Sequence, residues 1–318
     1  MLPTVVQVRS VRPAPPRKPE AIADPKAEEF FERFLRNRGT AGGVPAPRSI
    51  GSGVVIDGEG YVLTAAHLVE AGDSLYVRLA DGRTLAATLV GKDRRGGIAL
   101  LKIPARNLAA AVPGNPRRLR LAERVLALGA MPAGTPAVTD GIVSALESEE
   151  GDATGYLQTT AALHPSMGGG PLFNLAGEFV GVNAMLYSRV SGGSLSYAVP
   201  GDEALAIAKE LRASGRVRRA ALGITVAEVT PEAAALYGMD GPAGAYVQAV
   251  EPGGAAAKAG IAQGDVLLVL NGEPLRSDRH ATRMVMKLRP GDTVTLRVRR
   301  KADARDEELR VTLGEYTD

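Results

Sequence analysis

Residues 51–67, GSGVVIDGEGYVLTAAH, decide the fold, because two short runs rich in apolar and β-branched residues flank a turn of Gly and Asp. Comparable runs follow as far as about residue 200: LYVRLADGRTL, IALLKI, RVLALGA, GIVSAL, LQTTAAL, EFVGVNAMLY and LSYAVP. Short runs separated by Gly, Asp and Pro are typical of hairpins in closed antiparallel sheets. The sequence therefore predicts a mainly β domain over residues 46–215, which ends with a helix at GDEALAIAKELRASG.

The segments on either side of this domain have different patterns. Upstream, the proline-rich stretch RPAPPRKPE predicts an arm within residues 1–45, followed by a short amphipathic helix whose apolar face carries Phe30, Phe31 and Phe34. That face packs either inside the chain or at a subunit interface, and the sequence favours neither. Downstream, residues 216–318 alternate strand patterns with a helix from Ser277 to Leu288, which indicates one small α+β domain.

Composition narrows the classes of function. The 318 residues contain no Cys, which excludes disulfides and thiolate metal sites. The 38 basic and 35 acidic residues leave a net charge of +3, so neither nucleic acid nor an anionic membrane surface is expected as a partner. No apolar run reaches the roughly 18 residues of a membrane span, and a soluble chain is expected.

Two segments carry candidate chemistry. His67 ends the run at 51–67, where a His is more often structural than catalytic. The stretch LHPSMGGGPLFN, residues 163–174, is either a tight turn or a loop whose backbone N–H groups face a ligand oxygen, as in an oxyanion hole. His67 and His164 alone make an incomplete metal site, so no metal and no cofactor are expected.

These segments, in this order, resemble the HtrA family of trypsin-like serine proteases with a C-terminal PDZ domain. The resemblance spans about residues 48–316 and rests on GSGVVID, GYVLTAAHLV, IALLKI, GGPLFNLAGEFVGVN and YAVP, followed by the PDZ-like AALGITVAEV and GAYVQAVEPGGAAAKAGIAQGDVLLVLNG. It implies a trypsin-like double β-barrel followed by one α+β PDZ domain. It also implies a periplasmic or envelope location, and trimers held by N-terminal aromatic residues.

Departures from the family pattern fall on the catalytic triad. The resemblance implies that His67 is the triad His, whereas Gly97 stands at the Asp position and Gly168 at the Ser position, within an oxyanion loop of Ser166, Met167 and Gly168. Glycine supplies neither a nucleophile nor a carboxylate, and loss of triad members costs on the order of a million-fold in turnover. We therefore predict an inactive homologue, a pseudoprotease that is not an enzyme. The alternative is an active endopeptidase in which Ser166 is the nucleophile and works with His67.

The second domain retains the features that peptide binding needs. The resemblance places the carboxylate-binding loop at Ala221, Leu222, Gly223 and Ile224, with Met284, Val285 and Leu288 completing an apolar pocket. Some of these side chains must instead form the core. The expected partners are unfolded proteins or C-terminal peptides, bound by a chaperone, scaffold or regulatory subunit in envelope protein quality control. The expected assembly is a homotrimer, or a mixed trimer with an active HtrA-like protease.

Overall fold

The computed structural model describes residues 1–11, 49–70, 74–150, 153–184 and 195–316. It divides into two compact units, Met1–Val217 and Arg218–Asp318. The predicted helix that carries Phe30, Phe31 and Phe34 lies outside the described residues.

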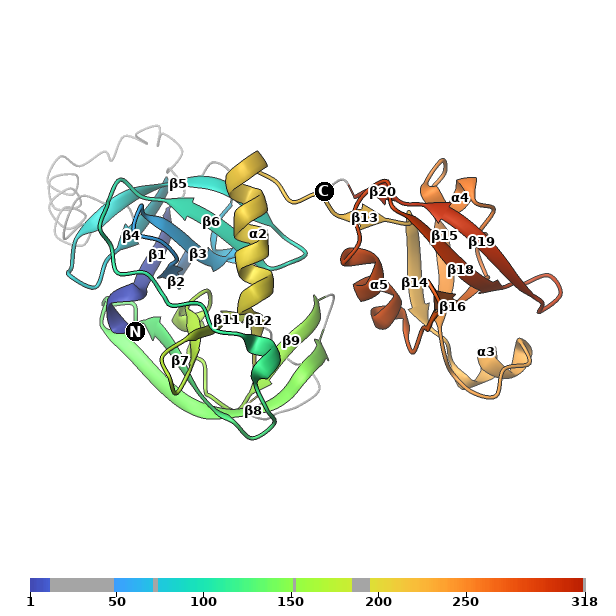
Figure 1. Cartoon of the computed structure of the whole chain (residues 1–318), viewed down its shortest axis with the longest axis horizontal. Coiled ribbons are helices and arrows are strands. Elements are labelled where there is room, and N and C mark those ends of the chain that lie inside the picture. Colours follow the sequence, from blue (N-terminus) through green and yellow to red (C-terminus); the bar gives the residue numbers. More distant parts are fainter. Residues whose placement is uncertain (12–48, 71–73, 151–152, 185–194, 317–318) are drawn as a thin grey trace, which may run out of the picture. The chain divides into compact units, whose positions relative to one another are not determined.

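A closed antiparallel barrel forms the first half of unit 1 (Figure 1). Its core consists of apolar side chains that alternate along the strands with outward-facing residues. The N-terminal strand belongs to this barrel and pairs with a neighbour on each side, so the first domain includes a segment that sequence analysis assigned to an arm. In barrel order the strands are β1 (Val5–Val11), β2 (Ser49–Val55), β3 (Tyr61–Ala65), β6 (Ile98–Lys102), β5 (Thr84–Asp93) and β4 (Ser74–Arg78).

A second closed barrel follows, and the two together confirm the predicted double β-barrel. In barrel order its strands are β10 (Pro171–Asn174), β11 (Phe179–Ala184), β12 (Ser196–Pro200), β9 (Ala153–Thr159), β8 (Pro136–Glu150) and β7 (Arg124–Ala130). The described part of this unit also contains four short 3-10 helices: η1 (Leu2–Thr4), η2 (Ala66–Leu68), η3 (Pro116–Arg118) and η4 (Pro165–Met167). Of these, η2 carries His67, and η4 leads into the three consecutive glycines.

Helix α2 (Gly201–Ser214), which the sequence pattern predicts at the end of the first domain, packs on both barrels. Its buried face, which includes Ile207 and Leu211, joins the core cluster that also contains residues of both barrels. The helix ends at Gly215, whose φ of 73° is a left-handed conformation that glycine adopts without strain. None of the helices in the described ranges is long and apolar enough to cross a membrane.

Unit 2 is an antiparallel sheet with three helices, in agreement with the predicted α+β domain (Figure 1). The sheet order is β14 (Ile224–Glu228), β15 (Ala245–Val250), β16 (Val266–Leu270), β18 (Thr293–Arg299) and β19 (Asp306–Thr312), with β17 (Glu273–Pro274) beside β16. A separate pair joins β13 (Ala220–Ala221) to β20 (Gly314–Glu315). The helices are α3 (Pro231–Leu236), α4 (Ala255–Lys258) and α5 (Asp278–Met286), and β14 lies at one edge of the sheet.

Tyr156 on β9 is a buried titratable side chain in the core of unit 1 whose pKa is strongly shifted. Burial, with a smaller contribution from the charge of Glu203, raises the pKa of Tyr156 to about 12. Its ring meets the edge of Tyr197 at a centroid distance of 6.4 Å. This phenol ionises at a higher pH in the folded protein than in the unfolded chain. It therefore stabilises the folded state below pH 10, and this contribution is lost as the pH rises toward 12.

We expect wild-type protein to lose on the order of 2 to 3 kcal/mol of unfolding free energy between about pH 10 and pH 12 through this phenol. Tyr156→Phe should remove that part of the alkaline loss. Urea unfolding at closely spaced pH values measures it, and absorbance near 295 nm reports phenolate formation. Identical alkaline profiles for the two proteins would show that Tyr156 ionises as readily in the folded as in the unfolded state.

Candidate functional site

The loop around Gly168 is held to the first barrel by one serine. The hydroxyl of Ser52, on β2, donates to the carbonyl of Ser166 at 2.6 Å and accepts from the backbone N–H of Ala130 at 2.8 Å. The backbone N–H of Ser52 donates to the carbonyl of Gly168 at 2.8 Å. The loop is therefore fixed from both barrels, and its backbone has a defined conformation.

His67 lies in η2 with Gly97 beside it. The N–H of Ala66 donates to the carbonyl of Gly97 at 2.8 Å, which places these two predicted triad positions next to each other. His67 is exposed at the surface, and partial desolvation of its ring lowers its pKa. A lowered pKa keeps the imidazole neutral at pH 7, so it is able to accept a proton.

Gly97 has a backbone that disfavours an L-residue. Its φ is +70°, and a Cβ there would lie 3.7 Å from the hydroxyl of Tyr156 and 3.8 Å from Val199. There is room for a side chain, but the left-handed conformation strains it. Gly168, by contrast, has φ −56° and ψ 136°, which any residue adopts.

Ser166 contacts His164, where sequence analysis paired it with His67. Its Oγ lies 2.9 Å from Nδ1 of His164, and its backbone N–H donates to the same nitrogen at 3.1 Å. His164 caps the N-terminus of η4, and Pro165 sets the turn that returns residue 166 to its ring. Ser166 as a residue is 4% exposed, whereas His164 is exposed. In the sequence, the feature that could have predicted this contact is the spacing of two residues between His164 and Ser166, with Pro165 between them.

The N–H groups of the predicted oxyanion loop have acceptors within the loop. That of Ser166 donates to His164, and that of Gly168 donates to the carbonyl of Pro165 over a long 3.4 Å. Met167 is 1% exposed and belongs to the core of the second barrel. In this conformation both donors are therefore engaged inside the loop.

In unit 2, the loop Ala221–Ile224 precedes the edge strand β14. Gly223 has φ +71°, as the turn into the strand requires. Leu222 is buried in the domain core, whereas Ile224 is partly buried and packs against it. This loop and strand are where the resemblance places the peptide carboxylate.

The predicted pocket residues on and after α5 divide between core and surface. Val285 is buried, while Met284 and Leu288 are partly buried and pack against the same core cluster as Ile224. Ser277 caps the helix by accepting from the N–H of His280 at 3.0 Å. Arg218, upstream of the loop, is paired with Glu315 at 2.9 Å, so its charge is already compensated.

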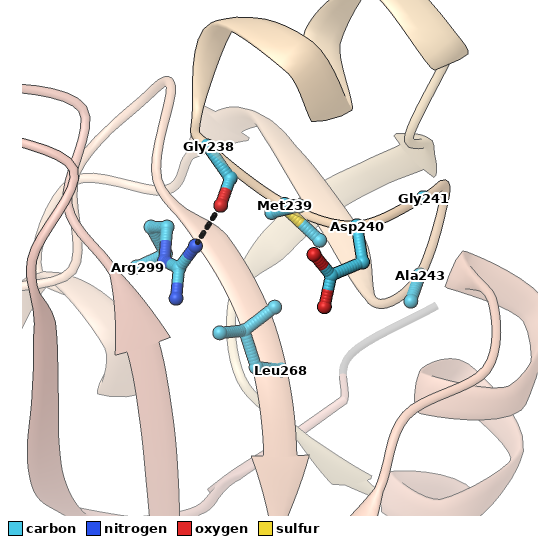
Figure 2. A pocket seen from close by; sticks show the side chains of 7 residues that line it. All are labelled: Gly238, Met239, Asp240, Gly241, Ala243, Leu268 and Arg299. Atoms are coloured by element: carbon cyan, nitrogen blue, oxygen red, sulfur yellow. Dashed lines mark hydrogen bonds between the residues drawn. The ribbon is translucent and has the colours of Figure 1, made fainter.

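Figure 2 shows a pocket of about 300 Å³ elsewhere in this unit, between the segment after α3 and strands β16 and β18. Arg299 donates to the carbonyls of Tyr237 and Gly238, and the hydrogen bond that it donates to the carboxylate of Asp306 is the main cause that raises its pKa. The carboxylate of Asp240 lies on the opposite side. The pocket contains none of the residues that the sequence singled out. Within the described ranges, no three His, Asp or Glu side chains gather as metal ligands.

Comparison with known protein families supports the fold of both units. Residues 51–182 match the trypsin-like peptidase domain, and residues 220–313 match the PDZ domain. The molecule is thus a trypsin-like protease fold joined to a PDZ domain.

Relatives of known name extend this assignment. A probable periplasmic serine endoprotease, DegP-like, from Pseudomonas savastanoi pv. phaseolicola is 40% identical over 304 residues, which are 92% of this chain and 63% of the relative. The solved HtrA-type protease AlgW with decapeptide superposes with a TM-score of 0.77 at 28% identity, covering 100% of this chain and 97% of that one. The solved serine endoprotease from Yersinia pestis superposes with a TM-score of 0.70 at 29% identity, covering 99% of this chain and 95% of that one. This chain belongs to the HtrA family of trypsin-like serine proteases with a PDZ domain.

Length separates this chain from its curated relatives. It spans slightly less than two thirds of the first relatives it matches, 62% to 64% of their length. It covers nearly the full length of the solved HtrA-type structures.

The prediction that the chain is not an enzyme is wrong on this comparison. Relatives 37% to 40% identical over more than nine tenths of the chain are named serine endoproteases. The prediction treated missing side chains at Gly97 and Gly168 as decisive. Its alternative named Ser166, two residues before position 168, as the nucleophile but paired it with His67, whereas the Oγ of Ser166 lies 2.9 Å from Nδ1 of His164.

Gly97→Ala should destabilise unit 1 by about 1 to 2 kcal/mol, because alanine is strained at positive φ. Gly58→Ala is the matched control, since a Cβ there also has its nearest neighbour at 3.7 Å but its φ is not positive. We expect the control to stay within about 0.5 kcal/mol of wild type. Urea midpoints measure both. Equal midpoints for the two variants would contradict the assigned backbone strain.

Proposed function

We propose that this chain acts in the periplasm as an HtrA-type endopeptidase that recruits its protein substrates through the PDZ domain. The domain binds unfolded segments or C-terminal peptides, which add as a strand to the free edge of β14. A trimer, either of this chain alone or mixed with another HtrA-like protease, and held by Phe30, Phe31 and Phe34, is part of the proposal. The names of the relatives, and the peptide-bound state of the AlgW structure, support it.

The observation that carries the recruitment step is the unpaired edge of β14. Among the described residues this strand pairs with β15 alone, so its other side offers backbone donors and acceptors to an extended peptide. Ile224, Met284 and Leu288 are partly buried and lie around the same core, which gives an apolar side chain of the ligand a surface to cover. Backbone pairing supplies affinity, and the apolar surface supplies selectivity.

For the chemical step we propose Ser166 as nucleophile and His164 as the base. Attack of Ser166 Oγ on a peptide carbonyl would transfer the hydroxyl proton to His164 Nδ1, which then returns it to the leaving amine. Water hydrolyses the resulting acyl group. Among the described residues no carboxylate bonds to the imidazole of His164 to orient it, and such a loss costs about ten-thousand-fold in Ser-His-Asp enzymes. Covalent labelling is therefore a more sensitive measurement than turnover.

Peptide binding is tested by truncating the apolar surface beside β14. Leu288→Ala should weaken binding of an extended peptide with an apolar C-terminus about 5- to 30-fold, as expected for loss of a half-buried leucine contact. Leu309→Ala is the matched control, because Leu309 is also partly buried against this core but lies on β19 at the opposite edge of the sheet. Isothermal titration calorimetry on the full chain measures both. Equal losses, or no binding by wild type, would refute the recruitment step.

The nucleophile is tested with a fluorophosphonate, whose phosphorus bonds to an activated serine oxygen as fluoride leaves. We expect labelling of wild type to be abolished by Ser166→Ala and slowed about 10²- to 10⁴-fold by His164→Asn, the range for loss of a general base. Ser214→Ala controls for the loss of an unrelated surface serine. His67→Ala distinguishes the two candidate bases and should label like wild type. Absence of labelling, or labelling that survives Ser166→Ala, would rule out this nucleophile.

A further inference from the structure

Two carbonyl groups before β14, those of Leu222 and Gly223, face the turn that starts at Glu251 and leads into α4. The carbonyl of Leu222 accepts from the N–H of Ala256, and that of Gly223 accepts from the N–H of Glu251, each at 2.8 Å. In a trans peptide unit the C=O and the following N–H point in opposite directions. The N–H groups of Gly223 and Ile224 therefore point away from this turn, and the N–H of Ile224 faces the unpaired edge of β14.

Glu251 brings a negative charge to this loop. A side-chain carbon on Gly223 would lie 3.2 Å from Oε2 of Glu251, so the carboxylate rests against the loop backbone. Glu251 itself is exposed. No described residue forms an ion pair or a side-chain hydrogen bond with it, and Arg218, which precedes the loop in the chain, is paired with Glu315. The charge is thus uncompensated by a neighbouring cation.

The distance between this carboxylate and a bound peptide terminus is short. Standard bond lengths place Oε2 of Glu251 and a ligand oxygen that accepts from the N–H of Gly223 within about 9 Å of each other. That separation is shorter than the screening length of about 10 Å at 0.1 M salt. Two negative charges at this range repel each other, whereas an uncharged ligand end escapes the repulsion.

We propose that Glu251 is a specificity-determining residue that weakens the binding of free C-terminal carboxylates, so that the groove accepts internal segments of unfolded chains nearly as well as chain ends. This inference rests on the proposed recruitment function and names the ligand class. The strand edge and the apolar surface still bind the peptide backbone and side chains. The acidic side chain removes most of the advantage that a terminal carboxylate gains from the free N–H groups.

The test uses one peptide in two forms, with a free carboxylate or with a terminal amide. Both are titrated by calorimetry at low salt into the full-length wild type, Glu251→Gln and Glu308→Gln. Glu308 is the control because it is an exposed carboxylate on β19, at the far edge of the same sheet. Glutamine keeps the size of glutamate and removes the charge.

We expect wild type to bind the two forms with affinities within about threefold of each other. Glu251→Gln should raise affinity for the free acid about two- to tenfold, leave the amide unchanged, and lose this gain as salt rises. Glu308→Gln should change neither. If Glu251→Gln changes the affinity for the free acid and for the amide equally, this inference is overturned and the recruitment function is not. Failure of both forms to bind any of the proteins would overturn the recruitment function and this inference with it.

Discussion

The hydrogen bonds of Ser52 are the constraint on which the candidate catalytic site depends. One side chain on the first barrel binds the carbonyl of Ser166 and the N–H of Ala130, and its backbone binds Gly168. A further bond, from the hydroxyl of Thr64 to the carbonyl of Ser52 at 2.7 Å, fixes the serine itself. All of these groups are buried, so breaking any bond would leave a polar group unsatisfied. The loop conformation is therefore set by both barrels together.

Close packing explains the glycines that follow η4. A Cβ on Gly169 would come within 2.4 Å of the Ser52 carbonyl, and one on Gly170 within 2.3 Å of the Leu128 carbonyl. Gly169 also has φ +81°. Only glycine allows the two barrels to approach so closely at this point. The run of glycines thus has a structural requirement that holds whether or not the loop presents N–H groups to a substrate.

In the loop Ser166–Gly168, the roles expected from the family pattern differ from the contacts that the structure shows. The resemblance to the HtrA family gives each residue the role of the family residue at the matching position. On that basis residue 168, a glycine, is not a nucleophile. The structure instead joins Ser166 to His164 within the loop, and it engages both candidate oxyanion donors inside η4. A serine, an imidazole and a set of N–H groups are all present, but their arrangement differs from the one that a comparison by position assumes.

The sequence by itself determined a mainly β domain of closed antiparallel sheets, the α+β domain and helix α2, because alternating and helical apolar patterns specify which face of each element is buried. The arrangement as a double barrel followed from the resemblance to the HtrA family. The sequence also located the Gly223 loop and the turn that carries His67. Only the tertiary structure decided that Val5–Val11 belongs to the first barrel, that His164 is the partner of Ser166, and that Glu251 lies against Gly223. Each of these depends on where a backbone segment turns in space, and side-chain spacing along the chain does not contain that information.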